Sequence, residues 1–105
     1  MTVLDASAVL ALLQDEPGAD VVEDAIDRGA VVSAVNLAEV VTKMVDAGAA
    51  VDRAADLVLG LFVEVEPYAL QAAVDAARIR SVTTERGLSL GDRACLSLAR
   101  SRELS

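Results

Sequence analysis

The sequence predicts a single α/β domain built on a parallel sheet. Along the chain, short segments typical of buried strands alternate with segments of helical spacing. The 105 residues are enough for one small domain. Hydrophobic residues make up 54% of the chain and aromatic residues only 2%, so Ala, Val and Leu must build the core. Such a core suits helices that pack closely on a parallel sheet.

The predicted strands are three short apolar segments, Met1–Leu4, Ala30–Ser33 and Phe62–Glu66. The first is apolar with a β-branched pair, and the third alternates apolar and polar residues. Between and after them the spacing predicts helices, with glycines such as Gly29 and Gly48 as C-terminal stops. We expect these helices over residues 7–14, 19–28, 36–47, 51–61 and 69–85, with Gly87 as an interruption, and from Gly91-Asp92 toward Arg100.

Three carboxylates, Asp5, Glu39 and Asp92, each stand beside an apolar run. Burying an unpaired carboxylate costs on the order of several kcal/mol. Asp5 ends the first strand, Glu39 lies about one turn into the helix after the second strand, and Asp92 opens the last helix. Because ligands bind beyond the carboxyl ends of parallel strands, all three acids can face one rim of the sheet. A hard divalent cation with oxygen ligands would hold such a cluster together, so the sequence predicts a metal-dependent acidic pocket.

Simpler interpretations of each acid stay open at this point. Asp5 could be a turn-forming acid after a strand. Glu39 could form a surface pair with Lys43, worth only about 0.3–0.5 kcal/mol. Asp92 could be an ordinary acid at a helix N-terminus, paired with Arg93.

Several chemistries are excluded by the residues present. The chain has no histidine, which removes imidazole bases, Ser-His triads and His-containing zinc sites. An Asp-x-Asp phosphotransferase would need an acid at Ser7, and there is no glycine-rich phosphate loop. Cys95, expected to be a small core residue, is the one cysteine, so an internal disulfide is impossible and a cytoplasmic setting is favoured. The apolar run Ala8–Leu13 is too short to cross a membrane, and we expect neither secretion nor membrane binding.

The net charge of −8 argues against a broad electrostatic footprint on nucleic acid. It leaves room for an enzyme whose bound metal ion meets a phosphate locally. Six of the nine basic residues lie in the last third of the chain, as either a solvated charged face or a rim that faces phosphate.

Three motifs together resemble the PIN-domain ribonucleases, and among these the VapC toxins of bacterial toxin-antitoxin pairs. They are Asp5-Ala6-Ser7-Ala8 after a hydrophobic strand, the segment Ser33–Val40, and the segment Leu88–Leu96. The resemblance covers essentially the whole chain in order and spacing. It implies a three-layer α/β/α fold with a central parallel sheet.

The resemblance also implies which residues form the site. Asp5, Glu39 and Asp92 match the acids that hold Mg²⁺ or Mn²⁺, as one ion or two. Ser7 matches the small hydroxyl residue beside the first acid, and Asn36 a polar position one helical turn before the glutamate. We favour a helix cap for Ser7 and for Asn36, with a second role left open.

Arg93 follows Asp92 directly, so it either orients that acid or meets the phosphate.

Family members cut RNA at a phosphodiester bond, so we expect a metal-dependent endoribonuclease that acts as a cytoplasmic toxin. The expected partners are a cognate antitoxin, the RNA substrate and a second copy of the chain.

The family normally continues into further strands that carry a fourth acid. We therefore expect residues 1–105 to form one PIN-like domain without these strands, whose first strand is an open edge that invites pairing. The rival interpretation is a catalytically incomplete module that acts by binding a partner protein.

Overall fold

The computed structural model describes residues 1–61, 63–83 and 88–104. Strands and helices alternate along these residues, as the sequence predicts. The elements are β1 (Thr2–Leu4), α1 (Ala6–Leu13), α2 (Ala19–Asp27), β2 (Ala30–Ser33), α3 (Ala34–Asp46), α4 (Val51–Leu59), β3 (Glu64–Glu66), α5 (Leu70–Thr83) and α6 (Leu90–Leu104).

The strands form one parallel sheet in the order β1-β2-β3. Val3 pairs with Val31, and Val32 pairs with Val65, so β2 lies between the other two strands. The predicted parallel sheet is confirmed. Within the described residues β1 and β3 are its edges, and the carboxyl ends of all three strands point the same way.

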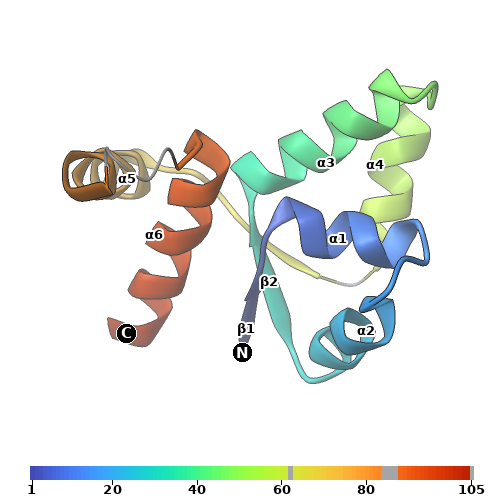
Figure 1. Cartoon of the computed structure of the whole chain (residues 1–105), viewed down its shortest axis with the longest axis horizontal. Coiled ribbons are helices and arrows are strands. Elements are labelled where there is room, and N and C mark those ends of the chain that lie inside the picture. Colours follow the sequence, from blue (N-terminus) through green and yellow to red (C-terminus); the bar gives the residue numbers. More distant parts are fainter. Residues whose placement is uncertain (62, 84–87, 105) are drawn as a thin grey trace.

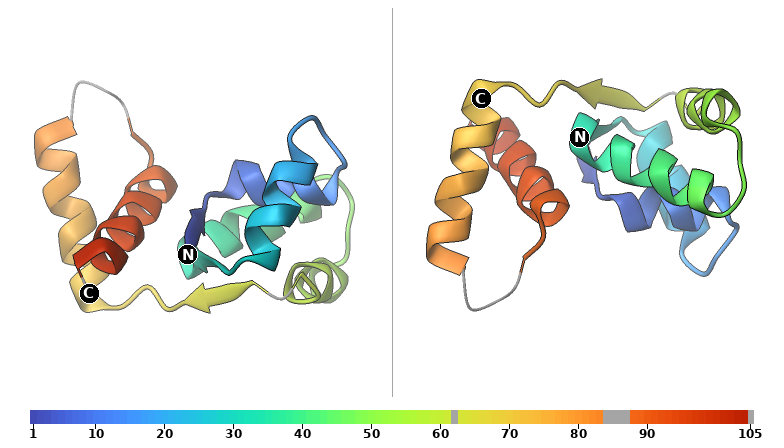
Figure 2. Two further views of the ribbon diagram at one scale, coloured as in Figure 1. Left: turned by 90° about the horizontal axis from the view of Figure 1, so that it is seen from below. Right: turned by 90° about the horizontal axis from the view of Figure 1, so that it is seen from above.

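Helices cover both faces of the sheet (Figures 1 and 2). Helices α1 to α4 lie on one side, while α6 packs against β1 and β2 from the other side with α5 outside it. The alternation within β2 fits this arrangement, because Ala30 and Val32 join the main core while Val31 points to the opposite face. The three-layer α/β/α fold is therefore as expected.

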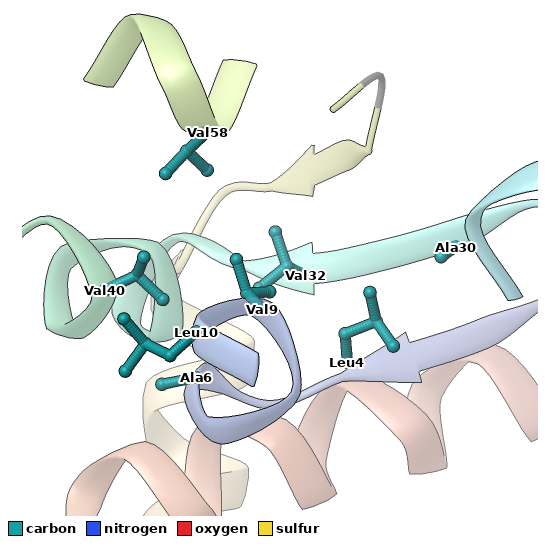
Figure 3. Close-up of a cluster of buried hydrophobic side chains, with 8 residues drawn as sticks. All are labelled: Leu4, Ala6, Val9, Leu10, Ala30, Val32, Val40 and Val58. Carbon is teal, nitrogen blue, oxygen red and sulfur yellow. The ribbon is translucent and has the colours of Figure 1, made fainter. Parts of the chain in front are cut away.

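The main core is aliphatic throughout, as the composition predicts. Val9 of α1, Val32 of β2 and Val40 of α3 are at most 1% exposed and lie at its centre (Figure 3). The other members of this buried cluster are Leu4, Ala6, Leu10, Ala30 and Val58. This core fixes α1 and α3 against the sheet, and both helices start at its carboxyl edge.

Two predicted caps are wrong. Ser7 is the second residue of α1, and Asp5 is its N-cap, since the Asp5 side chain accepts a bond from the backbone N–H of Ala8 at 2.8 Å. Asn36 is the third residue of α3, and Ser33 is the N-cap through a bond from Val35 N at 3.2 Å. In both cases a residue directly at the strand end reaches the free N–H groups first.

Other boundaries differ more mildly. Helix α6 runs to Leu104, beyond the predicted end near Arg100. The predicted glycine stops are confirmed, because Gly29 and Gly48 have φ angles of +106° and +107°, which favour glycine. Phe62 and residues 84–87, including the predicted interruption at Gly87, lie outside the described residues. Among the described helices, none has the length and apolar character needed to cross a membrane.

Candidate metal centre

Asp5 lies where β1 passes directly into α1. Its carboxylate is exposed and caps α1 through the bond from Ala8 N. A capping carboxylate satisfies one of the free N–H groups at a helix start and interacts favourably with the helix dipole. The interpretation of Asp5 as a structural acid after the strand is thus confirmed in part, and the cap uses only one of its two carboxylate oxygens.

Glu39 lies in the second turn of α3 and is partly buried. Its Oε1 accepts a hydrogen bond from Nδ2 of Asn36 at 2.9 Å. The carboxylate is therefore held on the side of α3 that faces α6. Asn36, and not the alternative partner Lys43, orients the Glu39 carboxylate.

Asn36 connects two of the elements that carry acids. Its side chain is 1% exposed, and Nδ2 also donates to the backbone carbonyl oxygen of Gly91 at 3.0 Å. Its Oδ1 is buried without a hydrogen-bond partner among the described residues. Asn36 thus links α3 to the first turn of α6, across 55 residues of sequence.

Asp92 lies in that first turn of α6. Its carboxylate accepts a bond from Ser89 N at 3.1 Å, and its own N–H donates to Ser89 Oγ at 3.1 Å. This reciprocal pair is a capping box. Asp92 therefore has a structural partner in Ser89, where the sequence suggested Arg93.

Cys95 lies in the negative potential of the three acids. Burial raises the pKa of the Cys95 thiol above its ordinary value of 9.0, and the negative charges of Asp5, Asp92 and Glu39 raise it further. All three acids therefore contribute to the negative potential at this one side chain. Cys95 is partly exposed beside the acids, which differs from the expected core position.

The three carboxylates share this neighbourhood without meeting at one point. Within the described residues, no three His, Cys, Asp or Glu side chains form a group that could hold a metal ion. Asp5 and Asp92 are bonded to the N–H groups of their own helix starts, and Glu39 is bonded to Asn36. Their joint action as metal ligands stays a prediction.

The donor set nevertheless fits a hard divalent cation. It consists of carboxylate oxygens from three segments, with no imidazole in the chain. The buried Oδ1 of Asn36 is a further oxygen without a donor in the described part of the chain. Mg²⁺ and Mn²⁺ prefer oxygen ligands of this kind, and the single thiol offers no soft alternative site.

Gly91 is a site residue that the sequence analysis missed. A Cβ atom at this position would overlap Oε1 of Glu39, so the carboxylate lies against the bare backbone of α6. A glycine inside the first turn of a helix is the signal that could have found it, because glycine is otherwise unfavourable there.

Two further predicted residues, Ser7 and Arg93, have no bond to these acids in the described part of the chain. Ser7 is exposed in the first turn of α1. Arg93 is partly buried against α5, where Nη1 donates to the carbonyl oxygen of Ala76 at 3.3 Å. Its predicted role toward Asp92 or a phosphate stays a prediction.

Two late arginines have acidic partners within the domain. Arg100 pairs with Asp75 at 2.8 Å, and Arg102 pairs with Glu64 and with Glu66. These pairs favour the interpretation of the basic residues as a charged face over that of a phosphate rim. Arg100 also borders a cavity of about 620 Å³. Residues of α5 and α6 line this cavity together with Glu66 and Tyr68.

Comparison with known proteins adds one finding to this geometry. The family model of the PIN domain matches residues 2–105. No curated protein and no solved structure matches the chain.

Proposed function

The chain belongs to the PIN domain family, whose members are commonly metal-dependent nucleases, and we propose that it is an endoribonuclease that depends on Mg²⁺ or Mn²⁺. One observation carries the proposal: Asn36 bonds both Glu39 Oε1 and the Gly91 carbonyl oxygen, which holds the Glu39 carboxylate against the turn of α6 that carries Asp92. Acids gathered at the carboxyl edge of a parallel sheet are placed where such folds bind ligands.

In this proposal Asp5, Glu39 and Asp92 hold the ion. When bound, a divalent ion supplies an activated water at neutral pH and stabilises negative charge on a phosphate. The chain's own contribution is to orient the carboxylates through Ala8, Asn36 and Ser89.

Cys95 takes no chemical part. Its raised pKa keeps the thiol protonated at neutral pH, so it is neither a base nor a nucleophile. With no histidine in the chain, the carboxylates are the groups left to accept a proton near the site. This leaves metal-assisted hydrolysis as the reaction class that the residues support best.

We further propose that the enzyme is the cytoplasmic toxin of a toxin-antitoxin pair, with RNA as substrate, a cognate antitoxin as inhibitor and a homodimer as the working form. The resemblance of the three motifs to VapC toxins supports this role. The net charge of −8 repels RNA, so the bound cation would have to supply the local attraction.

The test is cleavage of total RNA by the purified chain with Mg²⁺, with Mn²⁺ and with chelator. We expect cleavage with metal only, and its loss in Asp5→Asn. Asp20→Asn is a matched control, because Asp20 is also an exposed acid at a helix start, on α2. Cleavage that persists in chelator, or in Asp5→Asn, would contradict the proposal.

A second function is favoured by a specific observation, namely that the three carboxylates do not meet at one point in the described residues. In that case the domain acts by binding a partner protein through the edge strand β1. A folded chain that neither binds a divalent ion nor cleaves RNA would support this alternative.

A further inference from the structure

The side chain of Asn36 makes two bonds from one amide nitrogen. Nδ2 donates to Glu39 Oε1 at 2.9 Å and to the Gly91 carbonyl oxygen at 3.0 Å. Both hydrogens of the amide therefore have acceptors. Turning the amide over would place Oδ1 against two oxygens, so the orientation is set by its neighbours.

This orientation leaves Oδ1 of Asn36 buried without a partner in the described part of the chain. Leaving a buried acceptor unsatisfied is unfavourable for folding. In addition, the Gly91 carbonyl lies in α6, where the backbone N–H four residues later can already donate a hydrogen bond to it. Fold stability alone therefore gives little reason for an amide at this position.

Gly91 completes the arrangement. Any Cβ at position 91 would overlap Oε1 of Glu39, so only glycine lets this carboxylate lie against the first turn of α6. Asp92 is the next residue in that turn. The amide of Asn36 and the missing Cβ of Gly91 together tie Glu39 to the helix that carries Asp92.

We propose that Asn36 is a positioning residue that holds the Glu39 carboxylate against α6, so that Glu39 and Asp92 face one cation. The absence of a Cβ at Gly91 leaves the room that this carboxylate occupies. The inference rests on the proposed function, since it concerns the same metal centre. It assigns a task to an amide and a glycine that carry no charge of their own.

The first variant is Asn36→Leu, which keeps a similar size and removes both bonds. Partners that orient metal ligands typically change metal affinity about 10- to 100-fold when they are removed. We expect Asn36→Leu to bind Mn²⁺ about tenfold or more weakly than wild type. Binding is measured without RNA, from the electron paramagnetic resonance signal of free Mn²⁺. Melting in chelator should stay close to wild type, as should that of the control Thr42→Leu on the exposed face of α3.

The second variant is Gly91→Ala, which displaces Glu39 by a different route. It should weaken Mn²⁺ binding to a similar extent, while Gly60→Ala at the C-terminal end of α4 should leave it unchanged. Gly91→Ala keeps the inference testable if Asn36→Leu fails to fold. In a Glu39→Gln background, neither Asn36→Leu nor Gly91→Ala should weaken binding further, because their shared target is gone.

The outcomes separate the two hypotheses. If wild type binds Mn²⁺ and cleaves RNA while Asn36→Leu and Gly91→Ala do both equally well, the positioning role is wrong and the proposed function stands. Effects that simply add to that of Glu39→Gln would also overturn it. If wild type itself binds no Mn²⁺ and leaves RNA intact, the proposed function fails and the positioning role falls with it.

Discussion

Single carboxylates in this domain serve the fold and the proposed chemistry at once. Asp5 caps α1, and Asp92 closes the capping box of α6. Each is therefore fixed at a helix start by bonds that use only part of its oxygen lone pairs. The consequence is that a substitution at either position must be chosen to separate the two tasks.

Asp5 offers such a separation. Asn and Asp are about equally good N-caps, so Asp5→Asn should keep the bond from Ala8 N and leave stability unchanged or slightly higher, because like-charge repulsion is relieved. Asp5→Ala should lose about 1 kcal/mol of unfolding free energy. Both variants should lose cleavage, as measured by urea unfolding in chelator and by an RNA assay. A clear loss of stability in Asp5→Asn would mean that the charge itself serves the fold.

Cys95 gives a pH dependence with a definite sign. Its pKa in the fold is raised, so the fold favours the protonated thiol, and that contribution is complete below the ordinary value of 9.0. It is lost as pH rises from about 9.0 through the higher value in the fold. The free energy of unfolding should therefore fall more steeply above pH 9 in wild type than in Cys95→Ala, measured by urea unfolding at a series of pH values. Equal slopes would mean that neither burial nor the nearby acids raise the pKa of the thiol in the fold.

At the scale of elements, the start of α6 is the part that the site depends on most. Its first turn carries Gly91 and Asp92, and it meets α3 through Asn36. The Ser-x-x-Asp pattern from Ser89 to Asp92 is typical of a capping box, whereas the predicted helix start is Gly91-Asp92. The helix begins at Leu90, which brings Asp92 into the first turn.

Ser89→Ala tests this helix start. Removing the hydroxyl leaves Asp92 N–H without its cap and should lower the free energy of unfolding by about 1 kcal/mol. For a domain of this size that corresponds to a fall in melting temperature of roughly 4–8 °C. Cleavage should change little, because the bond from the Ser89 backbone N–H to the Asp92 carboxylate remains in this variant. Thr42→Ala is the matched control, since Thr42 is exposed inside α3, and no loss is expected in either measurement.

For the whole molecule, the sequence was sufficient to predict the parallel sheet and its covering helices. β1 and β2 are short apolar runs and β3 alternates apolar and polar residues. Between consecutive strands, two helices return the chain to the edge where the strands begin. The placement of Asp5 and Glu39 near the carboxyl edge follows from that topology. These predictions rest on local patterns of residues, which is why they transfer well to the structure.

The contacts between distant segments could not be predicted in the same way. The bond from Asn36 to Gly91 depends on how closely α3 approaches α6, and no local pattern encodes that distance. The packing of Arg93 against α5 has the same origin. For the buried Asn36 the sequence therefore predicts only a cap, because capping is the one role that neighbours in sequence reveal.

The charge of the whole domain makes a further prediction. With 17 acidic and nine basic residues, general screening by salt should stabilise the fold modestly. A specific ion adds binding energy, about 2.7 kcal/mol at a concentration 100 times its Kd. Melting should therefore rise more with MgCl₂ or MnCl₂ than with NaCl of equal ionic strength, and chelator should reverse the rise. Equal effects of the salts would indicate screening alone.

The most direct measurement is calorimetric titration of Mn²⁺ into wild type and into Asp5→Asn, Glu39→Gln and Asp92→Asn. If the three acids form one centre, wild type should show saturable binding that each single substitution weakens strongly, while Asp20→Asn binds as wild type does. A substitution without effect would remove that acid from the centre. Two such results, or a wild type that binds no Mn²⁺, would contradict the existence of a three-carboxylate metal site in this domain.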